Sequence, residues 1–118
     1  MRDYRRGSIW LVSFDPSVGT EIKKTRPALI ISPTDFNQVR SKITLLPISS
    51  TKVKAKTIKP VVVEIKPSST NGLTLNSIVI AIEPNIFDKK RLVKYLGILE
   101  PYLMKRVESI FQTFFNFK

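Results

Sequence analysis

The chain has 118 residues, 42% of them hydrophobic and 25% charged, and 20 Lys and Arg against 9 Asp and Glu give a formal net charge of +11. This length and composition suit one globular domain with its own core and exclude a disordered chain. The sequence has no Cys and no His, which excludes disulfides, thiolate metal sites, a cysteine nucleophile and a histidine general base. The positive surplus favours a polyanionic partner, although extra lysine that only maintains solubility and an acidic protein partner remain alternatives.

The N-terminal segment, MRDYRRGS, is charged and leads directly into a strand-like run. It lacks the apolar region and the small-residue cleavage site of a secretory signal. No apolar stretch of the sequence approaches the length that spans a membrane. We therefore expect a cytoplasmic protein that does not associate with membranes.

Five short runs rich in β-branched and aromatic residues are typical of β-strands, and each is bounded by Pro, Gly, Asn, Ser or Lys. They are residues 9–14, 28–32, 43–48, 61–65 and 78–82. Most are apolar on both faces, which suits a small barrel or a sheet covered by a helix on one side and a partner on the other. Pro47 falls inside the third run and predicts an edge or a bulge at its end, because proline cannot donate to a strand ladder.

The remaining segments complete the predicted fold. Residues 35–40 predict about one helical turn, and residues 68–72, SSTNG, predict a turn in which Asn71-Gly72 tolerates positive φ. From Pro101 onward, apolar residues recur at helical spacing and predict an amphipathic helix packed on the sheet. We expect a core-facing stripe, with a groove for a partner as the alternative use of four aromatic residues: Phe111, Phe114, Phe115 and Phe117.

The charged segment before the second predicted strand reads VGTEIKKTRPALIIS, residues 18–32. It is interpreted either as a solvated turn or as a basic loop that holds a phosphate against a rigid strand. Gly19 would give the loop its tight turn, and Pro27 would preset the backbone for the strand.

The residue types that remain for chemistry are Arg, Lys, Ser, Thr and scattered carboxylates, with neither a P-loop nor a dinucleotide fingerprint. These groups suit phosphate, because a guanidinium fork binds two phosphate oxygens and stabilises charge that develops on them. RNA also carries its own nucleophile, the 2′-hydroxyl, which an enzyme needs only to position. Composition therefore leaves two hypotheses open, a metal-independent ribonuclease and a passive RNA-binding protein.

The order of motifs resembles that of the MazF/PemK-type toxins, the endoribonucleases of type II toxin–antitoxin modules. RGSIWLVSFDPSVGTEIKKTRPALIIS at residues 6–32 carries the specific part of the likeness. It continues through LPISS (46–50), NGL (71–73), DKKRLVKYLGIL (88–99) and the final helix. The resemblance implies a mainly β fold with α structure: one toxin domain over residues 1–118, built as an SH3-like small β-barrel of the MazF/PemK/CcdB-like type with a C-terminal amphipathic helix.

The resemblance also implies an activity and partners. The expected toxin is an mRNA interferase that needs no metal or cofactor and cleaves single-stranded RNA sequence-selectively to 2′,3′-cyclic phosphate and 5′-hydroxyl ends, which inhibits translation and growth. A homodimer is expected to bind the RNA across its interface, and a cognate antitoxin protein is expected to neutralise it.

Family motifs place the catalytic arginine at Arg26 and the catalytic hydroxyl at Ser49, where the family has threonine. Without the resemblance, a hydroxyl that caps a strand end would be the preferred interpretation of Ser49. Glu21 matches a loop carboxylate that either orients Arg26 or pairs with a neighbouring lysine in solvent. The expected RNA-binding residues, for whose lysines a purely solvated role is the alternative, are Lys23, Lys24, Thr25, Ser50, Lys52, Lys54, Lys56, Glu83 and Asn85.

Two departures from the family pattern bear on function. Arg6-Gly7-Ser8 replaces the usual Arg-Gly-Asp, which predicts the loss of a local hydrogen bond. Glu83-Pro84-Asn85 stands where many members have Gln-x-Arg, which lowers positive charge where RNA is expected to pass. Two rival hypotheses are therefore a non-catalytic RNA-binding or degenerate toxin module and a gyrase-targeting toxin on the same fold. Arg26 together with a hydroxyl at position 49 favours the nuclease.

Overall fold

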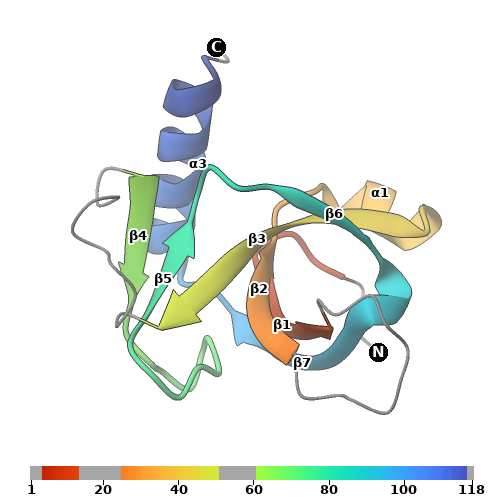
Figure 1. Cartoon of the computed structure of the whole chain (residues 1–118), viewed down its shortest axis with the longest axis horizontal. Helices are drawn as coiled ribbons and strands as arrows, with labels where there is room; N and C mark the ends of the chain where they lie inside the picture. The colour runs from red at the N-terminus through yellow and green to blue at the C-terminus, as the bar shows by residue number, and fades with distance from the viewer. Residues whose placement is uncertain (1–3, 14–24, 51–60, 117–118) are drawn as a thin grey trace.

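The computed structural model describes residues 4–13, 25–50 and 61–116. Its elements are coloured along the chain in Figure 1. The strands are β1 (Ser8–Ser13), β2 (Thr25–Ile30), β3 (Lys42–Ser50), β4 (Val62–Ile65), β5 (Ser77–Ile80), β6 (Asn85–Asp88) and β7 (Leu92–Ile98). The helices are α1 (Thr34–Val39), the 3₁₀ turn η2 (Lys89–Arg91) and α3 (Pro101–Phe115).

All strand pairs are antiparallel, and the sheet order is β4-β5-β3-β2-β1-β7, with β6 paired to β3 beside this path. β1, β2, β3, β6 and β7 curve around one half of the molecule, while β4, β5 and the end of β3 lie against α3 (Figure 1). Among the described strands, the order does not return from β7 to β4, so the barrel is not closed. The expected mainly β, barrel-like architecture with a C-terminal helix is confirmed.

Two clusters of buried residues explain why the strands are apolar on both faces. Successive residues of a strand point to opposite faces, so Ile9 of β1 enters one cluster while Trp10 and Val12 enter the other. The ring core lies within the curved half and consists of Trp10, Val12, Ala28, Ile30, Ile43 and Leu45. The helix core lies between the sheet and α3 and consists of Ile9, Leu29, Leu46, Ile48, Val63, Ile65, Leu73, Val79, Ala81, Leu99, Leu103 and Val107.

Pro47 does not mark an edge or a bulge, so that expectation is wrong. β3 is an interior strand, and Pro47 pairs with Ala28 of β2. On its other side, β3 pairs with β6 at residues 42–45 and with β5 at residues 48–50. Pro47 therefore falls where β3 exchanges one neighbour for the other, and its missing N–H interrupts neither of those ladders.

Most expected elements are confirmed, but the sequence pattern missed β6 and β7. α1 matches the helical turn expected over residues 35–40, and the expected turn at 68–72 contains Gly72 at φ +74. The sequence pattern does not predict β6 and β7 because these strands expose both apolar and charged residues, including Ile86, Val93 and Lys94. In the part of the chain that is described, no helix is long and apolar enough to cross a membrane.

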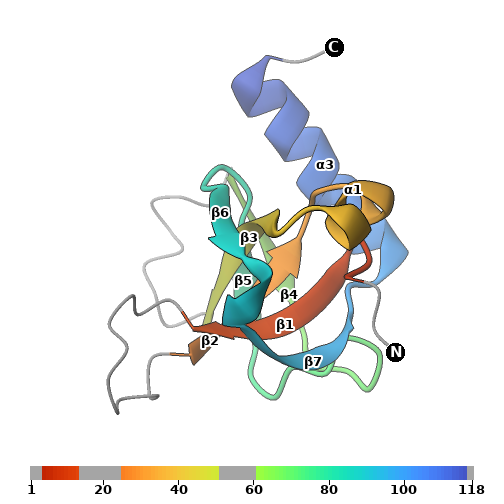
Figure 2. The ribbon, with the colours of Figure 1, turned by 90° about the vertical axis from the view of Figure 1, so that its right-hand side faces the viewer.

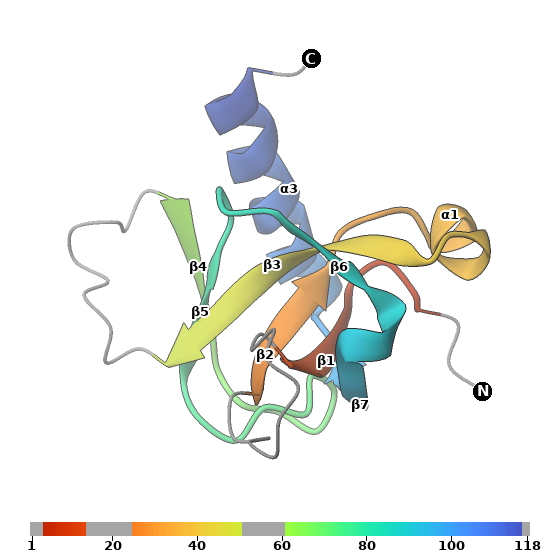
Figure 3. The same cartoon turned by 45° about the vertical axis from the view of Figure 1, so that its right-hand side comes forward.

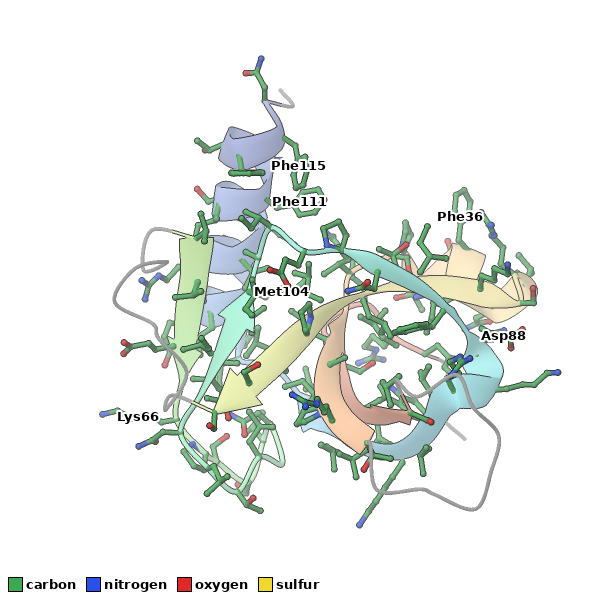
Figure 4. All side chains as sticks on the ribbon, viewed as in Figure 1. Phe36, Lys66, Asp88, Met104, Phe111 and Phe115 are labelled. Carbon is green, nitrogen blue, oxygen red and sulfur yellow. The ribbon has the colours of Figure 1, made fainter. Side chains whose placement is uncertain are left out.

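The helix α3 begins at Pro101, as expected, and packs its first turns on the sheet. Leu103 and Val107 are buried in the helix core, so a core-facing stripe is confirmed for this half of the helix. The C-terminal half projects beyond the strands in Figures 1 and 2. There Phe111 and Phe115 lie with ring centroids 4.7 Å apart (Figure 4), and Phe114 is 53% exposed. Phe117 lies outside the described residues.

Candidate functional site

Arg26 belongs to strand β2 and not to a preceding loop, which corrects the prediction that a charged loop ends at Pro27. Its backbone pairs with Val12 of β1, and Pro27 pairs with Leu11. Arg26 lies on the same strand face as Ala28 and Ile30, which are fully buried in the ring core, whereas Arg26 itself is exposed. The guanidinium group is therefore carried by a core strand at the point where that strand emerges into solvent.

Ser49 lies near the end of β3, the strand beside β2, and pairs with Ile78 of β5. In the β2–β3 register Ala28 is opposite Pro47. The β2–β3 pairing ends at Ala28 and Pro47, so Arg26 and Ser49 each lie two residues beyond the last pair, and from Ile48 onward β3 pairs with β5. The two residues that the sequence nominated as catalytic therefore lie on neighbouring strands, and their joint role stays a prediction. In Figure 3 β2 lies beside the middle of β3, and the start of β2 and the end of β3 diverge.

A pocket of about 110 Å³ adjoins this pair of strands. β2 and β3 contribute Pro27, Ile48, Ser49 and Ser50, and the segment that leads into β5 contributes Leu73, Thr74, Leu75 and Ser77. Half of these side chains carry hydroxyl groups and half are apolar, and none is charged. Such a lining suits an uncharged group with a flat apolar surface and hydrogen-bonding edges.

Glu83 lies on the connection from β5 to β6 and Asn85 begins β6, and neither residue lines this pocket. Both are exposed, and Asn85 Nδ2 donates to the Glu83 carbonyl at 3.1 Å. Asn85 pairs with Leu45, four residues along β3 from Ser49, a separation of about 13 Å at the usual rise of a strand. The structure therefore does not place Glu83 and Asn85 in direct contact with the Arg26 and Ser49 pair.

A family model described as PemK-like, MazF-like toxin of type II toxin-antitoxin system matches residues 5–115. The chain belongs to this family. It is 46% identical over 55 residues to endoribonuclease PemK of Escherichia coli, an alignment that covers 47% of this chain and 41% of that protein. It is 38% identical over 55 residues to endoribonuclease MazF9 of Mycobacterium tuberculosis, covering 42% of this chain and 47% of that protein. Each alignment therefore spans less than half the length of the curated relative.

Solved structures of MazF-type proteins share the fold along nearly the whole chain. An endoribonuclease in complex with its cognate antitoxin from Mycobacterial species has a TM-score of 0.73 at 22% identity, with 100% of this chain and 98% of that chain covered. MazF from Deinococcus radiodurans gives a TM-score of 0.73 at 22% identity, with 95% and 96% covered. The Mycobacterium tuberculosis toxin MazF-mt6 gives 0.74 at 19% identity, with 94% and 98% covered. The expected PemK/MazF fold is confirmed.

Several predicted site residues of this PemK/MazF-family chain fall outside the described ranges. They are Glu21, Lys23 and Lys24 before β2, together with Lys52, Lys54 and Lys56 after β3. Two neighbours are described: Thr25 begins β2 opposite Ser13, and Ser50 ends β3 opposite Ser77. The roles of all these residues stay predictions. Within the described ranges, no group of three or more acidic side chains is arranged to hold a metal ion.

Ser8, where the family usually has aspartate, forms its own hydrogen bonds. The side chain is buried, and its Oγ donates to the Arg5 carbonyl at 2.6 Å and accepts from Trp10 Nε1 at 3.0 Å. The loss of the hydrogen bond that an aspartate carboxylate would make here stays a prediction, whereas the Ser8 hydroxyl has two partners of its own. The hydroxyl ties the residues before β1 to the aromatic part of the ring core.

Two features near the site were missed in the sequence. Arg91 follows a run of lysines, and its Nη1 donates to the Ser13 carbonyl at 3.2 Å, at the end of β1 beside Thr25. Asn71 was interpreted only as a turn residue, yet it is fully buried and hydrogen-bonded on both sides of its amide. The Lys-Lys-Arg run was a sequence signal for Arg91. No local pattern reveals the role of Asn71, because its partner Glu100 is 29 residues away.

Proposed function

We propose that this chain is a toxin that acts as a metal-independent, sequence-selective endoribonuclease on single-stranded RNA in the cytoplasm, with residues 1–118 as one toxin domain. The proposal is supported by the positions of Arg26 and Ser49 on the neighbouring strands β2 and β3, each two residues beyond the last pair, Ala28 and Pro47. The names of the relatives PemK and MazF9, both endoribonucleases, support the same reaction.

The proposed reaction uses the RNA as its own nucleophile. The 2′-hydroxyl oxygen attacks the adjacent phosphorus and loses its proton, and the bond from phosphorus to the 5′-oxygen breaks. The 5′-oxygen takes up a proton, so the products are a 2′,3′-cyclic phosphate and a 5′-hydroxyl end. No metal or cofactor is needed for this balance of atoms.

Arg26 is assigned electrostatic stabilisation of the pentavalent phosphorane-like transition state. A guanidinium donates two parallel hydrogen bonds to phosphate oxygens, and a preorganised donor of this kind is worth about 10²–10³ in rate. A guanidinium group stays protonated at neutral pH, so arginine is a poor general base. Ser49 would donate its hydroxyl to a phosphate oxygen on the same face of the sheet.

RNA binding is proposed to extend from this pair to the segments on either side. Thr25 and Ser50 adjoin the pair directly, and the lysines at 23, 24, 52, 54 and 56 flank the two strands in sequence. Glu21 is proposed to orient Arg26. These assignments, with the net charge of +11, predict affinity that falls steeply as salt is raised.

A protein partner and an assembly complete the proposal. Because the mycobacterial endoribonuclease of the same fold was solved in complex with its cognate antitoxin, we assign a cognate antitoxin to this toxin as well. A homodimer with RNA bound across its interface follows from the family resemblance.

The rival function is a non-catalytic RNA-binding module. The exposed Glu83 and Asn85 favour it, because they stand where many family members have Gln-x-Arg and so lower the positive charge. To separate the two, the purified protein is incubated with mixed-sequence RNA in EDTA beside the variants Arg26→Ala and Arg40→Ala. Arg40 is an equally exposed arginine that follows α1, remote from Ser49, and so provides the matched control.

Cleavage by the wild type and by Arg40→Ala, with loss of cleavage in Arg26→Ala, supports the nuclease. Binding without cleavage by the wild type would support the rival module. Inhibition of DNA supercoiling by gyrase without RNA cleavage would instead indicate a gyrase-targeting toxin.

A further inference from the structure

The turn at residues 68–72 is seated directly against the backbone of β7. Ile98 N donates to the Thr70 carbonyl at 2.8 Å, and Gly72 N donates to the Ser68 carbonyl at 2.9 Å. A Cβ atom at Gly72 would lie 2.0 Å from the Leu96 carbonyl oxygen, and one at Gly97 would lie 2.3 Å from that of Thr70. Only glycine permits this approach, so the turn has one closely defined position on the strand.

Asn71 holds this turn together from within. Its Oδ1 accepts hydrogen bonds from Ser68 N at 3.1 Å and Leu73 N at 2.9 Å. Its Nδ2 donates to the Lys66 carbonyl at 2.9 Å and to the Glu100 carboxylate at 3.2 and 3.3 Å. One fully buried amide therefore fixes the backbone on both sides of the turn and links it to the start of α3.

Glu100 anchors the network at the N-terminus of α3, and it also accepts a hydrogen bond of 2.6 Å from Ser68 Oγ. Burial alone raises the pKa of this carboxyl. Hydrogen bonds from Ser68, from its own backbone and from Asn71 outweigh burial and hold the pKa below its ordinary value. A negative charge is favourable here because the N-terminus of a helix carries a partial positive charge.

The same turn leads directly into one wall of the pocket beside Ser49. Leu73, whose N–H is held by Asn71, lines the pocket together with Thr74 and Leu75, and faces the strand residues Pro27 and Ser49 across it. In Figures 1 and 3 the β4–β5 connection lies at the same end of the sheet as the end of β3. Glu100 does not line the pocket, and its carboxylate is linked to this wall through its hydrogen bonds from Asn71 and Ser68.

We infer that Asn71 and Glu100 are positioning residues that set the sequence preference of RNA cleavage, by fixing the wall of a nucleobase pocket beside Ser49. The inference rests on the proposed endoribonuclease function. A base fits this pocket better than a phosphate does, because its lining is apolar and hydroxyl-bearing without a charged side chain. Single-stranded RNA offers unstacked bases that proteins read by hydrogen bonds along their edges.

The test compares cleavage-site profiles on a randomised RNA pool in EDTA, with every protein sampled at the same extent of cleavage. A profile normalised in this way reports preference and does not depend on the fraction of folded protein. The variants are Glu100→Gln, which replaces one carboxylate oxygen by an amide donor facing Asn71 Nδ2, and Asn71→Ala. Should Asn71→Ala not fold, Ser68→Ala removes one donor to Glu100 in its place.

Asn37→Ala is the matched control. Asn37 is equally buried and donates to the carbonyls of Tyr4 and Ser32, but it lies on α1, across the molecule from the turn (Figure 1). We expect its profile to match that of the wild type even where its stability is lower.

In Glu100→Gln, we expect cleavage at the preferred sites to fall about tenfold relative to the other sites, the size of a misplaced contact in a specificity pocket. A Glu100→Gln profile identical to that of an active wild type would overturn this inference and leave the nuclease intact. A wild type that cleaves no RNA would overturn both. A shift of equal size in Asn37→Ala would also overturn the inference, because preference would then follow general stability.

Discussion

Arg26 of β2 lies directly opposite Val12 of β1, a residue whose side chain is fully buried in the ring core. The guanidinium group thus stands at the boundary between a packed core and solvent. The Arg26 backbone is held by the ladder with β1, so the main chain that carries the guanidinium need not become ordered when substrate binds. A fixed backbone at Arg26 contributes to the preorganisation of hydrogen-bond donors on which electrostatic stabilisation of a transition state depends.

Replacement of Arg26 by lysine should keep the charge but lose the planar fork that donates to two phosphate oxygens. We expect the single-turnover cleavage rate to fall about 10²-fold or more, while stability changes by less than about 0.5 kcal/mol because the side chain is exposed. Cleavage kinetics and thermal denaturation of the same preparation measure both quantities. A lysine variant as fast as the wild type would rule out a specific role for the guanidinium.

Replacement of Ser49 separates the hydroxyl group from the serine side chain as a whole. Ser49→Ala should lower the cleavage rate about 10²-fold, the effect of losing one hydrogen-bond donor to a developing charge. Ser49→Thr keeps the hydroxyl and introduces the threonine that the family has at this position, and it should cleave within a few-fold of the wild type. If Ser49→Ala cleaves normally, the hydroxyl only caps the end of β3.

The lysines at 52, 54 and 56 should act through the RNA backbone. For single-stranded RNA, each phosphate contact that is lost should make the slope of log affinity against log salt less negative by about 0.7, or about 2 for all three. Binding of RNA to an Arg26→Ala background at several salt concentrations gives this slope. The control replaces the exposed Lys42, Lys90 and Lys105 by glutamine, and an equal change there would show that only net charge matters.

Stability should fall at acid pH through Glu100. Because its folded-state pKa lies below the ordinary value of 4.5, the unfolded chain binds more protons, and this contribution is complete above that value. It is lost as pH falls through the folded-state pKa. Urea denaturation from neutral to acid pH should therefore show a flatter dependence in Glu100→Gln, with Glu64→Gln as the control for one exposed carboxylate. If the stability of Glu100→Gln depended on pH as strongly as that of the wild type, the stabilising role given to the hydrogen bonds of Glu100 would be contradicted.

The sequence predicted those elements whose hydrophobic pattern reports burial. β1, β4, β5 and α3 lie close to their expected positions, because their apolar residues fill the two cores. β7 was missed because it lies at the edge of the sheet and is only partly buried, with the neighbouring residues Val93 and Lys94 both exposed. Pairing of an edge strand depends on its neighbour's backbone, which a local hydrophobic pattern does not report.

The candidate site was predicted only in part, because local sequence patterns do not report how distant segments pair. Arg26 and Ser49 were identified from motifs, but the extension of β2 to Thr25 was not, because a polar strand end resembles a loop in sequence. The partnership of Asn71 with Glu100 spans 29 residues and depends on the close approach of two glycines to opposing backbones. Only the folded chain shows that a turn far from Ser49 in sequence forms the wall beside it.

The most direct test of the central claim measures cleavage in EDTA of two RNAs that differ at one atom, the 2′-oxygen of the nucleotide at the cleaved bond. The account predicts that the wild type cleaves the all-ribose RNA to a 2′,3′-cyclic phosphate and leaves the single 2′-deoxy RNA intact at that bond. Cleavage of the 2′-deoxy RNA at the same bond, at a comparable rate, would contradict attack by the 2′-hydroxyl and with it the role assigned to Arg26.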